Sequence, residues 1–188
     1  MIRVLPLVAL LLSASLSFAA PASASTAAQE KSRKIEMPKS ISDSLPWFAV
    51  REISENKSPF TRLHLEKLAA NNERTAIVYF ATWCIPCRVG VKRLVENIGE
   101  LNKNKVSVVL VDIGERDEDA IKNWVKKMGA EIFTVVNDPF KRLTEGFGLV
   151  KENEEISLPR TIVLNNKAKP LFMLSEEGSD WPQVLWEK

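Results

Sequence analysis

The sequence contains very few of the residues that bind transition metals. Its 188 residues include one histidine, His64, and two cysteines, Cys84 and Cys87. A structural zinc site takes four ligands, mostly from cysteine and histidine side chains. The chain cannot supply such a set, so no metal ion is expected. We expect His64 to be a surface or half-buried residue of a helix, because no partner lies near it in the sequence.

The chain also carries little net charge. Its 26 lysines and arginines and 24 aspartates and glutamates leave a formal charge of +2. Basic and acidic residues are interleaved, as between Glu115 and Asp119, so no basic stripe forms. A nucleic-acid-binding domain usually has such a stripe. We therefore expect no nucleic acid partner.

The N-terminal hydrophobic run is short for a membrane span. It extends from Val4 to Leu12 after the single charge of Arg3, whereas a spanning helix needs about 20 apolar residues. Ala22-Ser23-Ala24 follows and has the small residues of a signal-peptide cleavage site. We predict that residues 1–24 are a signal peptide and that the protein is exported to the periplasm. An uncleaved membrane anchor is the alternative.

The chain after this signal divides into a linker and one domain. Residues 25–44 are small, polar and charged and include Pro38, a composition that predicts a flexible linker. Residues 45–188 are predicted to form one α/β domain. Predicted strands are 49–53, 75–80, 106–111, 132–136, 161–164 and 171–174; predicted helices are 60–70, 84 to about 99, 117–128, 138–147 and 181–186. Polar and apolar residues alternate over 61–66, so a strand is the alternative for this segment. This order predicts a central mixed sheet flanked by helices on both faces.

Cys84 and Cys87 directly follow a predicted buried strand, so that Cys84 begins the next helix. Unpaired backbone N–H groups and the helix dipole at that position stabilise a thiolate and lower its pKa from about 8.5. Arg88 lies four residues later on the same helical face and could add positive charge. Pro86 is tolerated because the first helical turn does not need its N–H.

A bridge between these cysteines would stabilise the fold very little, since it closes a loop of only two intervening residues. A structural role is therefore a weak explanation, even in an oxidising compartment. The spacing favours a redox-active Cys84–Cys87 disulfide that needs no other cofactor. A structural thiol pair and half of a metal clip are the alternatives.

The segment Phe80-Ala81-Thr82-Trp83-Cys84-Ile85-Pro86-Cys87 resembles the active site of thioredoxin-like proteins, most of all the exported TlpA/ResA-type thiol:disulfide oxidoreductases. Other segments resemble the same family: Val108–Asp112 with the following helix, Asp138-Pro139 before a helix ending in Gly146-Phe147-Gly148, and Leu158–Val163. The resemblance covers about residues 45–188 and implies a thioredoxin-like fold. It also implies that Cys84 attacks the substrate and that Cys87 resolves the mixed disulfide.

Leu158-Pro159 matches the cis-proline segment of that family. The resemblance implies a cis Pro159 packed against the disulfide, with the Leu158 backbone pairing to the substrate chain. From the residues alone, a trans proline at the head of a strand is the simpler interpretation. Trp83 could shield the disulfide and contact partners, or plug the end of a strand.

The resemblance further implies dithiol–disulfide exchange with protein substrates in the reducing direction, for example in cytochrome c or oxidase maturation. A membrane electron donor would recharge the protein, and a monomer is expected. A thiol peroxidase is an alternative, although related peroxidases place a threonine where this chain has Ala81. A Cu(I)-binding metallochaperone is another, although the motif has no histidine or methionine nearby.

One feature of the family is missing from this sequence. Thioredoxin-like enzymes place a buried acid where it can take the proton of the resolving thiol. In thioredoxin this acid occupies the position of Val78, and in the ResA type the position of Gly90. Neither residue ionises, so proton transfer must use water or another acid, or run more slowly.

Overall fold

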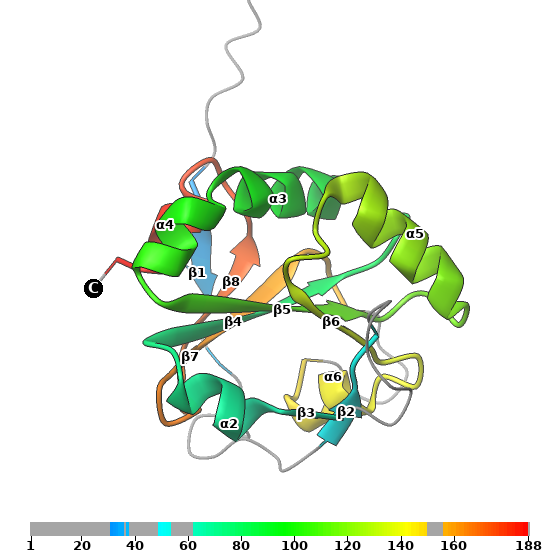
Figure 1. Cartoon of the computed structure of the whole chain (residues 1–188), viewed down its shortest axis with the longest axis horizontal. Coiled ribbons are helices and arrows are strands. Elements are labelled where there is room, and N and C mark those ends of the chain that lie inside the picture. The colour runs from blue at the N-terminus through cyan, green and yellow to red at the C-terminus, as the bar shows by residue number, and fades with distance from the viewer. Residues whose placement is uncertain (1–30, 36, 38–48, 54–61, 150–155, 188) are drawn as a thin grey trace, which may run out of the picture.

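The sheet at the centre of the structure has the strand order β1-β8-β7-β4-β5-β6 (Figure 1). The computed structural model describes residues 31–35, 37, 49–53, 62–149 and 156–187. Within these ranges, no helix combines the length and hydrophobicity that crossing a bilayer requires. The predicted signal peptide, residues 1–24, lies outside the described residues.

Three neighbouring strands of this sheet are parallel and three are added antiparallel. The parallel strands β4, β5 and β6 are followed on the other side by β7, β8 and β1, each antiparallel to the strand before it in the sheet. The sheet is therefore mixed, as predicted. The strands are β1 Arg33–Ile35, β4 Arg74–Phe80, β5 Val106–Asp112, β6 Thr134–Asn137, β7 Arg160–Asn165 and β8 Pro170–Glu176.

Helices cover both faces of the sheet (Figure 1). One face carries α3 Ile85–Glu96, α4 Ile98–Lys103, α5 Glu118–Met128 and α7 Trp181–Val184. The other carries α2 Leu65–Ala70 and α6 Arg142–Gly146. A separate antiparallel pair, β2 Ala49–Arg51 with β3 Arg62–His64, lies beside them. The fold is the α/β arrangement that the sequence predicts.

Two hydrophobic clusters, one on each face, sandwich the central strands. In β4, Val78 and Phe80 belong to the cluster under α3 and α5, while Ile77 and Tyr79 belong to the cluster under α2 and α6. Successive strand residues point to opposite faces, so a strand covered on both sides is apolar throughout. This is why β4 reads as a continuous hydrophobic run.

Local sequence signals set the ends of α5. The Asp117 side chain accepts a hydrogen bond from the Asp119 N–H at 2.9 Å and caps the helix start. Gly129 ends the helix with φ 67°, a left-handed conformation that glycine adopts without steric cost. The body of α5 is anchored by Trp124, whose ring stacks on Phe80 at a centroid distance of 4.6 Å. These bounds match the predicted helix.

The structure corrects the predicted linker for residues 33–35. Instead of lying in a flexible segment, they form β1 and pair with β8 at the edge of the sheet. Ile35 and Met37 pack against the cluster on the α2 side. Apolar residues at every second position suit a strand with one covered face, and the open edge of β8 supplies the hydrogen-bonding partners.

The predicted helices 60–70 and 138–147 are both longer than the observed ones. Arg62–His64 forms β3, in which Leu63 is buried and its neighbours Arg62 and His64 are exposed; this is the strand that the alternation of polar and apolar residues allowed. His64 is thus an exposed strand residue. The predicted start at Ser58-Pro59 lies outside the described residues. Helix α6 begins only at Arg142, since Lys141 has φ 55° and interrupts any helix from Pro139.

Candidate active site

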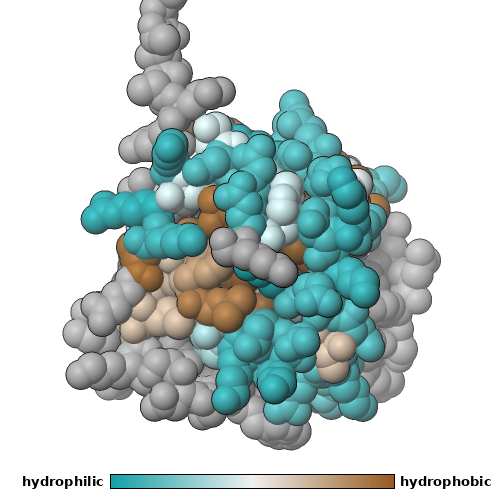
Figure 2. Space-filling view, turned by 90° about the vertical axis from the view of Figure 1, so that its left-hand side faces the viewer, coloured by the Kyte–Doolittle hydropathy of each residue, from teal (hydrophilic) through white to brown (hydrophobic). Residues whose placement is uncertain are grey.

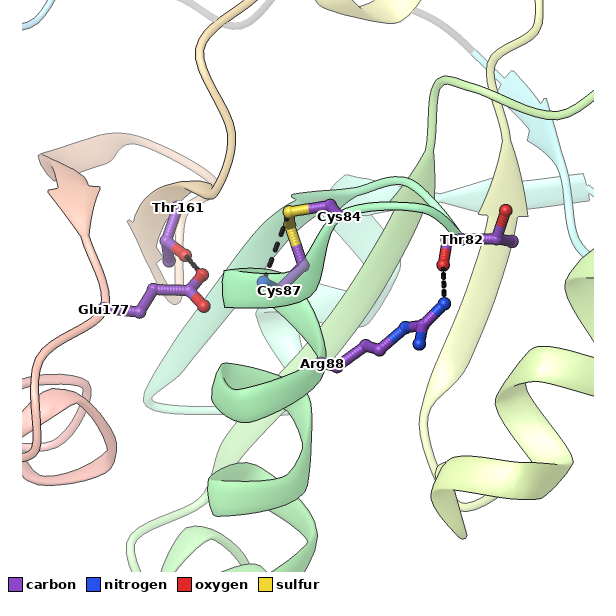
Figure 3. Close-up of a disulfide and its surroundings, with 6 residues drawn as sticks. All are labelled: Thr82, Cys84, Cys87, Arg88, Thr161 and Glu177. Carbon is purple, nitrogen blue, oxygen red and sulfur yellow. Dashed lines mark hydrogen bonds between the residues drawn. A yellow bond between two sulfur atoms is a disulfide. The ribbon is translucent and has the colours of Figure 1, made fainter.

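Cys84 and Cys87 form a disulfide at the N-terminus of α3, with their Cα atoms 5.3 Å apart. Cys84 is the N-cap residue, and its Sγ accepts a hydrogen bond from the Cys87 N–H at 3.2 Å. Figure 3 shows this bond beside the first turn of the helix. A helix N-terminus offers unpaired N–H groups to an anion. The geometry therefore favours negative charge on Cys84 when the disulfide opens.

The disulfide is buried, but hydrophobic side chains around it are exposed. Cys84 is 4% exposed and Cys87 1%. Trp83, Ile85 and Val89 are exposed by 64%, 71% and 48%, and Pro86 is also exposed. Large exposed hydrophobic side chains that gather at one place mark an interaction surface. A partner that covers this surface would reach Cys84 before Cys87, which lies one turn deeper.

Arg88 is held by the loop that precedes the helix. Its Nη2 donates a hydrogen bond to the Thr82 carbonyl oxygen at 2.8 Å. Figure 3 shows the guanidinium directed toward Thr82 and away from the sulfur atoms. A role in lowering the pKa of Cys84 stays a prediction, and the observed contact orders the Thr82–Trp83 loop.

The Leu158–Pro159 peptide bond is cis, as the resemblance implies. Pro159 is buried, and Leu158 packs against the hydrophobic cluster that contains both cysteines. β7 begins at Arg160, so Leu158 precedes the paired part of that strand. Thr161 follows on β7 and faces the disulfide region in Figure 3. This segment and the CxxC loop thus lie on the same side of the sheet.

A groove of about 580 Å³ runs between the CxxC loop and α5. Its floor and walls combine aromatic, aliphatic and basic side chains. They are Thr82, Trp83, Arg88, Ala120, Asn123, Trp124, Lys127 and Met128. The groove adjoins the CxxC loop through Thr82, Trp83 and Arg88.

Asp112 organises the loop that supports Trp83. Its Oδ1 accepts hydrogen bonds from the N–H groups of Gly114 at 3.1 Å and Glu115 at 2.8 Å. A Cβ on Gly114 would lie 2.9 Å from Nε1 of Trp83, so only glycine allows this close approach. Glu115 in turn accepts a hydrogen bond from the Thr82 hydroxyl. Asp112 is fully buried, and burial raises its pKa to about 6.

This raised pKa predicts a pH-dependent stability that Asp112→Asn should remove. The folded protein holds the Asp112 proton up to about pH 6, whereas the unfolded chain loses it near pH 4, so the wild-type free energy of unfolding falls between these values. The variant should therefore gain up to about 3 kcal/mol relative to wild type from pH 4 to pH 6. Urea unfolding across this range measures the difference. A pH-independent difference would contradict the assignment.

Glu177 is a buried acid that the sequence analysis missed. It follows β8, and its Oε1 accepts a hydrogen bond from the Thr161 hydroxyl at 3.0 Å (Figure 3). Although part of the residue is accessible, Oε2 is buried and has no hydrogen-bond partner within the described residues. Burial raises the pKa of Glu177 to about 8, against smaller opposing effects of Thr161 and Arg93.

Gly90 on α3 provides the space that the Glu177 carboxyl fills. A Cβ built on Gly90 would overlap Oε2 of Glu177 and lie 3.0 Å from the Trp181 ring. Glycine at the position where a related enzyme carries an acid is the one sequence signal that another side chain could occupy this space. No local pattern points to Glu177, because it comes from a distant part of the chain.

Within the described residues, no group of three or more histidine, cysteine, aspartate or glutamate side chains is placed to hold a metal ion. Figure 2 shows a hydrophobic area on the end of the molecule where α4 and the C-terminus lie. α4 precedes β5, so this end is opposite the disulfide, which follows the C-terminal end of the parallel strand β4.

Comparison with known proteins supports the fold and the kind of site. The model of the AhpC/TSA family matches residues 41–169. No curated protein sequence matches the chain significantly. The family match, together with the thiol-disulfide oxidoreductases among the solved structures described next, supports the prediction of a redox enzyme.

Several solved structures share the fold at low sequence identity. A secreted thiol-disulfide isomerase from Corynebacterium glutamicum is 19% identical, with a TM-score of 0.60 over 76% of this chain and 81% of that one. The thioredoxin domain of a thiol-disulfide oxidoreductase from Bacteroides vulgatus is 14% identical, with a TM-score of 0.60 over 77% and 94%. Peroxiredoxin Q from Xanthomonas campestris is 15% identical, with a TM-score of 0.58 over 81% and 92%. These similarities confirm the thioredoxin-like fold.

Proposed function

We propose that this chain, which belongs to the AhpC/TSA family, catalyses thiol–disulfide exchange with protein substrates through Cys84 and Cys87. The observation that carries the proposal is the buried Cys84–Cys87 disulfide at a helix N-terminus, with exposed hydrophobic side chains around it. Helix polarity favours Cys84 as the thiolate, and the exposed side chains provide a surface that can hold a protein partner.

The two cysteines differ in ways that suit successive roles. Cys84 is the N-cap residue next to the exposed Trp83 and Ile85, whereas Cys87 is 1% exposed and lies one turn into the helix. A substrate sulfur therefore meets Cys84 and forms a mixed disulfide there. Cys87 then attacks Cys84, which releases the reduced substrate and restores the Cys84–Cys87 disulfide.

The surroundings of the disulfide support an extended protein segment as substrate. The Leu158 backbone precedes the paired part of β7, next to the cis Pro159, and a substrate strand could add to it by main-chain hydrogen bonds. Trp83 and Pro86 would contact the same segment, and the groove along α5 would hold its continuation. The partner is thus a folded or unfolded protein with a disulfide or a dithiol.

The finer parts of the proposal follow the resemblance to TlpA/ResA-type proteins. We infer export to the periplasm after cleavage of residues 1–24, and work in the reducing direction, for example in cytochrome c or oxidase maturation. A membrane electron donor would return the disulfide to the dithiol. The protein would act as a monomer, with no cofactor besides the cysteine pair.

Peroxide reduction is the second candidate, because peroxiredoxin Q shares the fold. Two assays with the purified chain and dithiothreitol separate the candidates. We expect the chain to accelerate insulin disulfide reduction and to leave the rate of hydrogen peroxide consumption at the level of dithiothreitol alone. Peroxide consumption without insulin reduction would reverse the order of the two candidates. Titration with Cu(I) tests the metallochaperone alternative, which predicts a tight complex with both thiols.

A further inference from the structure

Exchange at a buried cysteine pair requires a route for one proton. When the disulfide opens by attack on Cys84, Cys87 leaves as a thiolate inside the protein. Cys87 is 1% exposed, so water is poorly placed to protonate it. A buried thiolate without a proton or a positive partner is costly. A nearby group that carries a proton at neutral pH would remove this cost.

Glu177 occupies the space in which such a group would be effective. Its Oε2 lies where a Cβ of Gly90 would be. Gly90 follows Cys87 by three residues on α3, and Cβ atoms at this spacing are about 5–6 Å apart on a helix. Oε2 therefore lies within direct reach of the Cys87 sulfur, or within reach through one water molecule. Figure 3 shows the carboxyl on the Cys87 side of the helix.

The surrounding contacts hold the carboxyl in this place. The Thr161 hydroxyl donates to Oε1, and Thr161 pairs with Val78 across β4 and β7. Arg93 donates to the backbone oxygens of Glu177 and Gly178 at 2.8 and 2.7 Å. Gly178 also donates to the hydroxyl of Ser32, next to β1. Oε2 is left buried and unpartnered within the described residues, directed at α3.

Burial, and not the charged groups around it, explains why Glu177 holds a proton. Arg93 on α3 is the cation whose field lowers its pKa, and Thr161 on β7 and Trp181 on α7 are neutral. Burial outweighs both lowering effects and brings the pKa to about 8. A thiol free in water has a pKa near 8.5, and burial disfavours its charged form, so transfer of the proton from Glu177 to the buried Cys87 thiolate is favourable, which suits general acid–base catalysis.

We propose that the carboxyl of Glu177 donates a proton to Cys87 when the disulfide opens and takes it back when Cys87 attacks. This assignment rests on the proposed exchange function. In the opening step, a thiolate of a dithiol donor bonds to Sγ of Cys84, the Cys84–Cys87 bond breaks, and the Glu177 proton moves to Sγ of Cys87. The second donor thiolate then displaces Cys84. The cysteine pair gains two electrons, the donor becomes a disulfide, and Glu177 is left as a carboxylate that exchanges protons with solvent. It is this carboxylate form that takes the proton of Cys87 in the reverse step.

The test is the pH dependence of disulfide opening in Glu177→Gln. We measure the rate with dithiothreitol from pH 6 to pH 9.5, by acid quench, alkylation and mass spectrometry, and divide it by the dithiothreitol thiolate concentration. In wild type the corrected rate should fall as Glu177 loses its proton near pH 8. The variant should be flat and about 100-fold slower at pH 6, the lower end of general acid–base effects. The two curves should approach each other above pH 9, with the ratio of their rates falling to about 4 at pH 9.5.

The exposed Glu100→Gln on α4 is the matched control and should behave as wild type. Equal rates for wild type and Glu177→Gln at every pH would overturn the proposal. A ratio of the wild-type rate to the variant rate that differs from one but does not change with pH would also overturn it, because it indicates a structural effect. Wild type that fails to reduce insulin would instead refute the exchange function itself. If Glu177→Gln does not fold, Thr161→Val provides the test. It removes the hydrogen bond that stabilises the carboxylate, so the wild-type inflection should move to higher pH; an unmoved inflection would overturn the assignment.

Discussion

Cys84→Ser is expected to abolish thiol–disulfide exchange. The hydroxyl of serine does not ionise near neutral pH and cannot form a mixed disulfide, and Cys87 is too deeply buried to replace Cys84 as the attacking group. The variant should still fold, because a disulfide that closes so short a loop contributes little to stability. Insulin reduction with dithiothreitol measures the loss, which should bring the rate to that of dithiothreitol alone.

Two further observations make this result specific. Circular dichroism and thermal unfolding should match those of reduced wild type, so that lost activity does not reflect lost structure. Alkylation of the variant should label Cys87 slowly in the folded state and rapidly after denaturation. Exchange that persists in Cys84→Ser would mean that Cys87 is the attacking cysteine, or that the activity does not arise from this pair.

Cys87→Ser is expected to stop the reaction at the mixed disulfide. Cys84 keeps its helix N-cap position and the N–H of residue 87, so it still attacks a substrate disulfide. Release of the adduct then depends on thiols from solution instead of a neighbour one turn away. Losing such an intramolecular attack should slow release by at least about 10³-fold. Non-reducing electrophoresis and mass spectrometry of purified adducts measure both yield and release.

The same variant identifies partners when it is expressed in cells. Proteins that are disulfide-linked to Cys84 should be recovered from Cys87→Ser and should be missing from the Cys84→Ser, Cys87→Ser double variant. The normal redox state of each captured partner indicates the direction of electron flow. Equal recovery with the double variant would show that the linkage does not involve Cys84.

The central strands and the position of the cysteine pair could be predicted because each depends on neighbouring residues. Residues 76–80 and 108–111 are hydrophobic throughout, which is what a strand covered on both faces requires. α5 has its own capping residues, Asp117 and Gly129. The two cysteines follow β4 directly and are followed by a helical pattern, so their place at a helix start needed no knowledge of the rest of the fold.

Predictions that depended on contacts with distant segments were less successful. Residues 33–35 have a polar, linker-like composition, and only the open edge of β8 makes them a strand. The Thr82 carbonyl binds the guanidinium of Arg88, a contact that the sequence did not indicate, and the role of Arg88 in lowering the pKa of Cys84 stays a prediction. The helix expected from Pro139 begins only at Arg142, because Lys141 adopts a left-handed backbone conformation, and Asp138 accepts hydrogen bonds from the backbone N–H and hydroxyl of Thr144 across this turn.

The sequence alone places Cys84 at the start of a helix and Cys87 one turn further in. This is possible because the signals for the strand, the loop and the helix lie in residues that are close in sequence. The sequence also shows that neither Val78 nor Gly90 can transfer a proton. Only the tertiary structure brings Glu177 from the end of β8 into the space beside Gly90 and buries its carboxyl. Burial, close packing and the resulting pKa arise from segments that meet only when the sheet and α3 are assembled.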